Sequence, residues 1–192
     1  MRSAAIFALR PSTLAAAAAL LASLGAQAGV VWSGNGHEYA YVDAANLTWT
    51  AARASALGLG DGWDLATLGS ADEDAFVRSL LPAGPERSHV WLGGTDAAAE
   101  GDWRWVSGEG FGFTHWWGGE PNNAGNEDYL AMDLRGMYAW NDAPNAMGAA
   151  GYNMLRGYVI ERDATSVPEP GTIALVGLAL LGAAGARRRR RG

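Results

Sequence analysis

Side chains with oxygen donors are concentrated in one stretch of the chain. Glu120-Pro121-Asn122 is followed by Glu127 and then by Trp140-Asn141-Asp142, which together supply three carboxylates and two side-chain amides. The set contains no sulfur ligand and no adjacent histidine, so it suits a hard cation that takes about six to eight oxygen ligands, namely Ca²⁺. Mg²⁺ fits less well, because it retains several of its waters. The sequence therefore predicts a calcium site.

Pro121 is expected to shape this site through the backbone. A proline restricts the preceding residue, here Glu120, to extended conformations. A cis bond before Pro121 would turn the side chains of Glu120 and Asn122 to the same side, and the sequence is compatible with either isomer.

Two helices and several short strands must position these ligands. The segment 48–57 starts at Thr48, a predicted helix cap, and has Trp49 and Ala52 at helical spacing. The segment 70–81 opens with Ser70 three residues before Glu73, which is a capping box. Trp32–Val42 alternates loosely and indicates an opening strand or hairpin. Short apolar segments of strand type follow at Asp64–Leu68, Val90–Gly93, Trp103–Val106, Tyr129–Met132 and Tyr158–Glu161. Glycine-, asparagine- and proline-rich loops join them. The pattern predicts a small α+β domain with long functional loops.

Composition limits the possible functions. The chain has 192 residues, no cysteine and nine tryptophans, so disulfides, thiolate metal sites and cysteine nucleophiles are excluded. Residues 29–165 contain 7 Arg and no Lys against 19 Asp and Glu, a formal charge of −12. Such a domain is a poor partner for nucleic acid, because neutralising phosphates requires clustered basic residues.

Both ends of the chain have the features of sorting signals. Residues 1–28 combine Arg2 and Arg10, an apolar run and Ala26-Gln27-Ala28, which is the pattern of a secretory signal peptide. Residues 166–192 contain Pro168-Glu169-Pro170, the apolar segment 171–186 and Arg187–Arg191. This tail predicts a short transmembrane segment with its arginines on the cytoplasmic side. The domain boundaries are therefore expected at 28/29 and 165/166.

The tail also resembles the PEP-CTERM sorting signal of Gram-negative bacteria that secrete polysaccharide. The ordered features are Pro-Glu-Pro, a short apolar helix and an arginine cluster, and they cover 167–192. The resemblance implies attachment to the membrane through the tail and then processing by an exosortase-type enzyme. The expected location is the cell envelope, the outer surface or the extracellular matrix.

Residues 37–161 resemble a C-type lectin-like domain without its usual cysteines. The matching motifs, in order along the chain, are Trp49-Thr50-Ala51-Ala52, Leu65–Ser70 with Glu73, Trp91-Leu92-Gly93-Gly94, Trp103-Arg104-Trp105, Trp117–Asn123 with Glu127-Asp128, and Trp140-Asn141-Asp142. The resemblance implies an α+β fold in which two helices flank small antiparallel sheets and a long loop region binds calcium. The four usual cysteine positions hold Ala56, Tyr129, Asn145 and Ile160, so core packing is expected to replace the bridges.

The resemblance also assigns roles to individual residues. The residues that would hold the primary Ca²⁺ and bind sugar are Glu120, Asn122, Glu127, Asn141 and Asp142, and the Glu-Pro-Asn order implies mannose- or glucose-type hydroxyls. A second, auxiliary calcium site is implied at Asp96, Glu100, Asn123 and Asp128, together with Glu127.

Three functions remain open from the sequence. The leading one is an exported, non-catalytic lectin that binds polysaccharide through Ca²⁺. The second is a calcium-stabilised module of the same fold that binds a protein. The third, a glycosidase, is disfavoured, because carboxylates held on a metal are poor proton donors and no Gly-x-Ser-x-Gly motif is present.

Overall fold

The computed structural model describes residues 25–26, 29–83, 88–134, 137–147 and 154–164. Most of the predicted leader and the whole predicted tail, including the apolar segment 171–186, lie outside these ranges. Within the ranges, no helix has the length and apolar character needed to cross a membrane.

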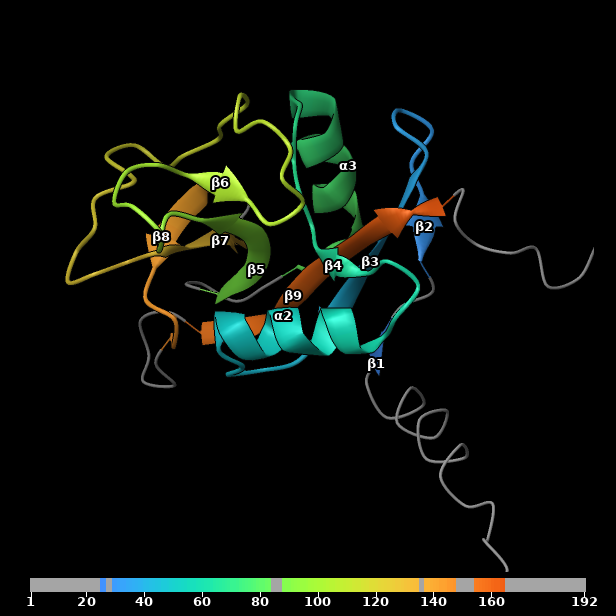
Figure 1. Ribbon diagram of the computed structural model, residues 1–192, viewed down its shortest axis with the longest axis horizontal. Helices are drawn as coiled ribbons and strands as arrows, with labels where there is room; N and C mark the ends of the chain where they lie inside the picture. Colours follow the sequence, from blue (N-terminus) through green and yellow to red (C-terminus); the bar gives the residue numbers. More distant parts are fainter. Residues whose placement is uncertain (1–24, 27–28, 84–87, 135–136, 148–153, 165–192) are drawn as a thin grey trace, which may run out of the picture.

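Two helices form where the capping signals predict them. Helix α2 (Trp49–Gly58) begins after Thr48, whose side chain accepts a hydrogen bond from Ala51 N. Helix α3 (Ala71–Leu80) begins after Ser70, whose side chain accepts from Glu73 N. These contacts satisfy backbone N–H groups that have no partner inside the helix. Figure 1 shows α2 and α3 on opposite sides of the strands.

The strands form one connected sheet rather than separate small ones. They are β1 (Gly25–Ala26), β2 (Val30–Val31), β3 (His37–Asp43), β4 (Asp64–Leu65), β5 (Ser88–Thr95), β6 (Arg104–Trp105), β7 (Tyr129–Asp133), β8 (Trp140–Ala143) and β9 (Met154–Asp163). Along the main path the order is β1-β3-β9-β5-β7-β8, and only the β5–β9 pairing is parallel among the described strands. The predicted α+β class is confirmed, with the strands joined more extensively than expected.

The central strands are buried on both faces of the sheet. Because alternate side chains point to opposite sides, one strand contributes residues to two core clusters. On β5, Val90 and Leu92 join the core cluster beneath α3, whereas Trp91 joins the cluster beneath α2. Gly93 lies on the same strand where another segment comes very close. A Cβ at Gly93 would lie 2.7 Å from Leu65 O, so only glycine allows this approach without a shift.

Packing and hydrogen bonds replace the four absent cysteines. Ala56 and Ile160 are 0% and 2% exposed and belong to the core cluster beneath α2. The Tyr129 ring lies 4.8 Å from that of Trp49, and Asn145 Oδ1 accepts from Thr50 N at the start of α2. Ala56 and Ile160 therefore pack in the core as expected, whereas Tyr129 is half-buried against Trp49 and Asn145 contributes a hydrogen bond rather than core packing.

Candidate functional site

The β7–β8 hairpin brings the two halves of the predicted site together. Its antiparallel register places Asp142 opposite Leu130 and Asn141 opposite Ala131. Glu127 and Asp128 immediately precede β7, whose first residue lies opposite the last residue of β8. They therefore lie at the end of the hairpin where Asn141 and Asp142 are found. In Figure 1 the long loops around β6, β7 and β8 gather at the left, on the opposite side of the molecule from β2.

Asp142 ties the Glu-Pro-Asn segment to β8. Its Oδ2 accepts hydrogen bonds from Asn122 N at 2.9 Å and from Asn123 N at 2.6 Å. The bond between Glu120 and Pro121 is cis, one of the two isomers compatible with the sequence. Asp142 itself is 1% exposed. A buried carboxylate thus anchors the loop through two backbone N–H groups.

The other predicted ligands surround this anchor. Asn122 Nδ2 donates to Glu120 Oε2, and the Glu127 carboxylate accepts from Ala124 N at 2.9 Å. Burial, together with the carboxylates of Asp142 and Glu127, raises the pKa of Glu120 to about 7. Burial is also the main reason that the pKa of Glu127 is raised. Like charges have therefore been brought together at partly buried positions.

Asn141 is the predicted ligand with the fewest recorded contacts to the other ligands. Its side chain is half-buried, and Nδ2 donates to the backbone carbonyl of Asp142. It follows Trp140 directly on β8, so its position depends on the strand rather than on contacts with the loop.

The donor chemistry fits Ca²⁺, and one buried atom supports the fit. Asp142 Oδ1 is buried and has no hydrogen-bond partner among the described residues. An orphaned anionic oxygen in such a place is costly unless something positive faces it. The described ranges contain no group of three or more His, Cys, Asp or Glu arranged to hold a metal ion. A cation here would therefore also need amide or backbone oxygens, such as those of Asn122 and Asn141.

The predicted auxiliary ligands form a second acidic group beside the first. Asp96 is 2% exposed; its Oδ2 accepts from Gly101 N at 2.8 Å, and its Oδ1 is buried with no partner among the described residues. Asn123 Nδ2 donates to Glu100 Oε2 at 2.5 Å, and Asp96 N donates to Asp128 O at 3.2 Å. Burial raises the pKa of Asp96, and the nearby charge of Asp128 adds to the effect. The two acidic groups are contiguous, since Asp142 adds to the negative potential at both.

One further carboxylate, which the sequence did not assign to the site, contacts the strand that carries Asn141 and Asp142. Asp74 on α3 accepts a hydrogen bond from Trp140 Nε1 at 3.1 Å, and its carboxylate lies 3.1 Å from Arg78 and from His115 Nδ1. Trp140 is fully buried and starts β8. Asp74 thus fixes the strand that carries two predicted ligands. Periodicity could have found it, because Asp74 lies three residues before Val77 on the buried stripe of α3.

An aromatic cluster fills the space between Asp74 and the loops. Trp116 lies 4.8 Å from Trp103 and 5.8 Å from Trp140, with near-perpendicular rings in the second pair. These edge-to-face contacts stabilise a segment that has little regular structure. Trp117 is 37% exposed at the start of the Gly118–Asn126 loop, although its backbone N donates to Trp140 O.

Comparison with known proteins identifies the family of this fold. The family model for the lectin C-type domain matches residues 46–145. Perlucin from Haliotis laevigata is 38% identical over 81 residues, which are 41% of this chain and 52% of perlucin. The type-2 ice-structuring protein of Osmerus mordax is 30% identical over 123 residues, which are 64% of each chain. The chain therefore spans less than two thirds of either relative.

A solved structure gives the same result. The C-type carbohydrate-recognition domain of cow CD23, determined in the presence of a GlcNAc2Man3 oligosaccharide, is 26% identical, with a TM-score of 0.59 over 71% of this chain and 93% of that one. At the carboxyl end, the model for the PEP-CTERM protein-sorting motif matches residues 166–190, and it indicates an exported protein sorted to the cell envelope. The chain belongs to the C-type lectin domain family and carries a PEP-CTERM sorting motif.

Proposed function

We propose that the protein is a calcium-dependent lectin that recognises mannose- or glucose-type hydroxyls of an extracellular polysaccharide. The observation that carries the proposal is the buried Oδ1 of Asp142, which has no hydrogen-bond partner in the described part of the chain and lies at the junction with Glu120, Asn122 and Glu127. Family membership and lectin relatives support carbohydrate binding in general. The calcium and the sugar class are the further steps proposed here.

The residues that would hold the primary Ca²⁺ are Glu120, Asn122, Glu127, Asn141 and Asp142. The bound ion would supply a Lewis acid for the lone pairs of two vicinal sugar hydroxyls. The carboxylates can accept hydrogen bonds from those hydroxyls, and the amides of Asn122 and Asn141 can donate to them. The Asp142 contacts with two backbone N–H groups hold the loop in register for this recognition.

An auxiliary Ca²⁺ is proposed at Asp96, Glu100, Asn123 and Asp128. The support is the unpartnered Asp96 Oδ1 and the contact between Asn123 and Glu100. Its role would be to neutralise charge behind the primary site, because the carboxylates of both groups repel one another.

Catalysis forms no part of the proposal. The family is generally non-catalytic, and carboxylates that hold a metal ion would be poor proton donors for glycoside hydrolysis. A calcium-stabilised protein-binding module is the alternative, and an ice-structuring protein among the relatives is named for a role other than sugar binding.

Export is proposed to place the domain where polysaccharide is found. The PEP-CTERM motif supports processing by an exosortase-type enzyme, with the membrane as a transient partner of the tail. The outer surface or matrix of a Gram-negative bacterium is the proposed final location.

A glycan array with the purified chain tests the proposal. We expect binding to mannose- or glucose-type glycans in Ca²⁺, loss of binding in EDTA and loss in Asn122→Asp, which removes an amide donor. Asn46→Asp is the matched control, because Asn46 is exposed and precedes α2 rather than lying in the loop. Binding that survives in EDTA would contradict the calcium mechanism. Absence of any glycan signal from folded protein would favour the protein-binding alternative.

A further inference from the structure

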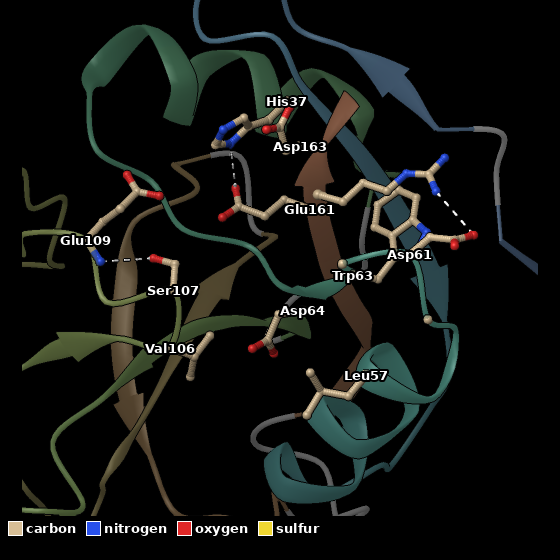
Figure 2. Close-up of a pocket in the computed structure, with 13 residues that line it drawn as sticks. His37, Leu57, Asp61, Trp63, Asp64, Val106, Ser107, Glu109, Glu161 and Asp163 are labelled. Carbon is tan, nitrogen blue, oxygen red and sulfur yellow. Dashed lines mark hydrogen bonds and ion pairs between the residues drawn. The ribbon is translucent and has the colours of Figure 1, made fainter. Parts of the chain in front are cut away.

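A cleft of about 450 Å³ lies away from the acidic loops, between the turn before β4, the segment after β6 and the end of β9. Its walls include Leu57, Trp63, Val106, Ser107, Glu109 and Glu161. None of the residues predicted to bind calcium lines it. Figure 2 shows the Glu161 carboxyl pointing toward the side of the cleft where Glu109 and Ser107 lie. The cleft is therefore a separate feature with its own chemistry.

Glu161 is the unusual residue of this cleft. It is 7% exposed, and its Oε2 has no hydrogen-bond partner among the described residues. Thr67 beside the carboxyl group counteracts part of the rise in its pKa, while the Thr67 hydroxyl donates to Ser107 Oγ at 2.9 Å. The nearest basic atom recorded for Oε2 is His37 Nδ1 at 4.0 Å, beyond hydrogen-bond distance. One buried oxygen thus faces the cleft without a donor.

The nearby arginines are engaged elsewhere. Arg162 Nε donates to Glu38 at 2.7 Å, and its guanidinium lies 4.5 Å from the Trp63 ring centroid. Arg53 Nε donates to Asp64 at 3.1 Å. No arginine ion pair recorded among the described residues therefore involves Glu161 or Glu109, and His37 Nδ1, 4.0 Å from Glu161 Oε2, is the basic group recorded for Glu161.

An organic cation fits this space better than a metal ion. The cleft is much larger than one metal ion, so a single ion would leave most of its volume unfilled. Leu57 and Val106 add apolar surface to the walls, which suits methylene groups beside the charge.

We propose that this cleft binds a small alkylammonium compound, with Glu161 accepting hydrogen bonds from the ammonium group and Glu109 adding a second negative charge. Charge-assisted hydrogen bonds are stronger than neutral ones, and burial of Glu161 strengthens them further. The ammonium group would also satisfy the orphaned oxygen.

Proton linkage supplies a second signature. Burial, Glu73 on α3 and Glu109 after β6 raise the pKa of Glu161 to about 8, while His37 on β3 faces it and Arg162 adjoins it on β9. A bound ammonium favours the ionised carboxylate, so binding near neutral pH releases a proton. Affinity should therefore rise as pH increases from 6 to 8.

Calorimetry on the purified full-length chain tests the proposal with 1,5-diaminopentane, in saturating Ca²⁺ so that the acidic loop is occupied. We expect saturable binding with proton release, and no binding of the neutral analogue 1,5-pentanediol. Glu161→Gln should weaken binding by about tenfold or more, since it keeps the size of the side chain and removes the charge. Asp72→Asn, at an exposed position on α3 outside the cleft, should bind like the unaltered chain.

Glu109 provides a second test that does not depend on a buried substitution. Glu109 is exposed, so Glu109→Lys should leave the fold intact while placing a cation at the cleft, and it should weaken diamine binding by about threefold or more. Absence of saturable diamine binding, equal binding of the diol, or undiminished binding by folded Glu161→Gln or Glu109→Lys would each overturn the proposal.

Discussion

Two buried carboxylates at different places in the molecule differ in how completely their oxygens are hydrogen-bonded. Glu73, on α3, is 7% exposed and both of its oxygens are used: Oε1 accepts from Tyr39 and from Asn35 at 2.9 Å, and Oε2 accepts from Gly69 N at 2.7 Å. Asp142, on β8, is more deeply buried but has one oxygen without a partner among the described residues.

The difference separates a carboxylate with a structural role from one that is proposed to bind a ligand. Glu73 joins β2–β3, the turn before α3 and the helix itself, so its hydrogen bonds are complete within the protein. The group around Asp142 brings together like charges that raise the pKa of Glu120, which leaves an electrostatic cost for a ligand to offset. Completeness of hydrogen bonding, rather than burial, distinguishes the two.

The largest expected effect comes from removing the Glu73 carboxylate, whose hydrogen bonds are complete within the protein. Glu73→Leu should lower the free energy of unfolding by about 3–5 kcal/mol, because Tyr39 Oη, Asn35 and Gly69 N lose their acceptor. Urea unfolding should show the same loss in Ca²⁺ and in EDTA, and Asp72→Asn on the exposed side of α3 should lose little. A loss confined to Ca²⁺ would show that Glu73 acts through the calcium loop.

Asp142→Asn should weaken calcium binding without lowering the stability measured in EDTA. An Asn at 142 can still accept from Asn122 N and Asn123 N, so unfolding in EDTA should be unchanged or require more urea as repulsion in the loop falls. Calcium affinity should fall by about 100-fold or more, since a buried charged ligand is lost. Thermal unfolding across a calcium titration measures both effects. A variant that unfolds as easily as Glu73→Leu in EDTA would contradict the distinction.

Glu161 extends the comparison, because its Oε2 also has no hydrogen-bond partner among the described residues, and it lies in a cleft that none of the proposed calcium ligands lines. Its pKa of about 8 in the folded chain, against 4.5 ordinarily, means that the folded state retains a proton that the unfolded state has lost. Its contribution to stability is therefore complete below pH 4.5 and declines as pH rises toward 8.

Glu161→Gln should remove that dependence. The stability of the variant relative to the unaltered chain should rise between pH 5 and 8, by up to about 1.4 kcal/mol per pH unit for one proton. Urea unfolding at several pH values measures the difference, and EDTA should leave it unchanged. Parallel stability curves for the two chains would show that Glu161 titrates normally.

The smallest expected effect isolates the cap of α3. Ser70→Ala removes the acceptor for Glu73 N and should cost about 1 kcal/mol of unfolding free energy. Calcium affinity measured by calorimetry should not change. If affinity fell together with stability, the helix and the calcium loop would be coupled more closely than the contacts through Asp74 suggest.

Local signals predicted much of the fold. Thr48 and Ser70 cap the two helices as expected, and the short apolar segments became strands because their side chains alternate between two buried faces. Strand lengths were harder to predict. Of the strand predicted at Asp64–Leu68, only Asp64–Leu65 pairs within the sheet. Its length depends on pairing with β9, which lies almost 100 residues away in the sequence.

The candidate site, like the fold, was predicted only in part from the sequence. The spacing of Glu120, Asn122, Glu127 and Asp142 indicated the donor set, and the structure brings these residues together. The sequence did not reveal Asp74 behind Trp140, because that contact joins α3 to β8 across 66 positions. It also did not reveal the Glu161 cleft, whose walls come from three separate segments.

Residue type and local order by themselves determined the helix starts, the oxygen-only character of the acidic loop, the PEP-CTERM sorting motif and the family. These properties depend on near neighbours in the chain, where capping, periodicity and motif spacing act. Only the tertiary structure decided which buried carboxylates are satisfied, since Glu73 and Asp142 differ in the donors that distant segments supply. A hydrogen bond requires a partner in space, and the sequence of one segment does not contain it.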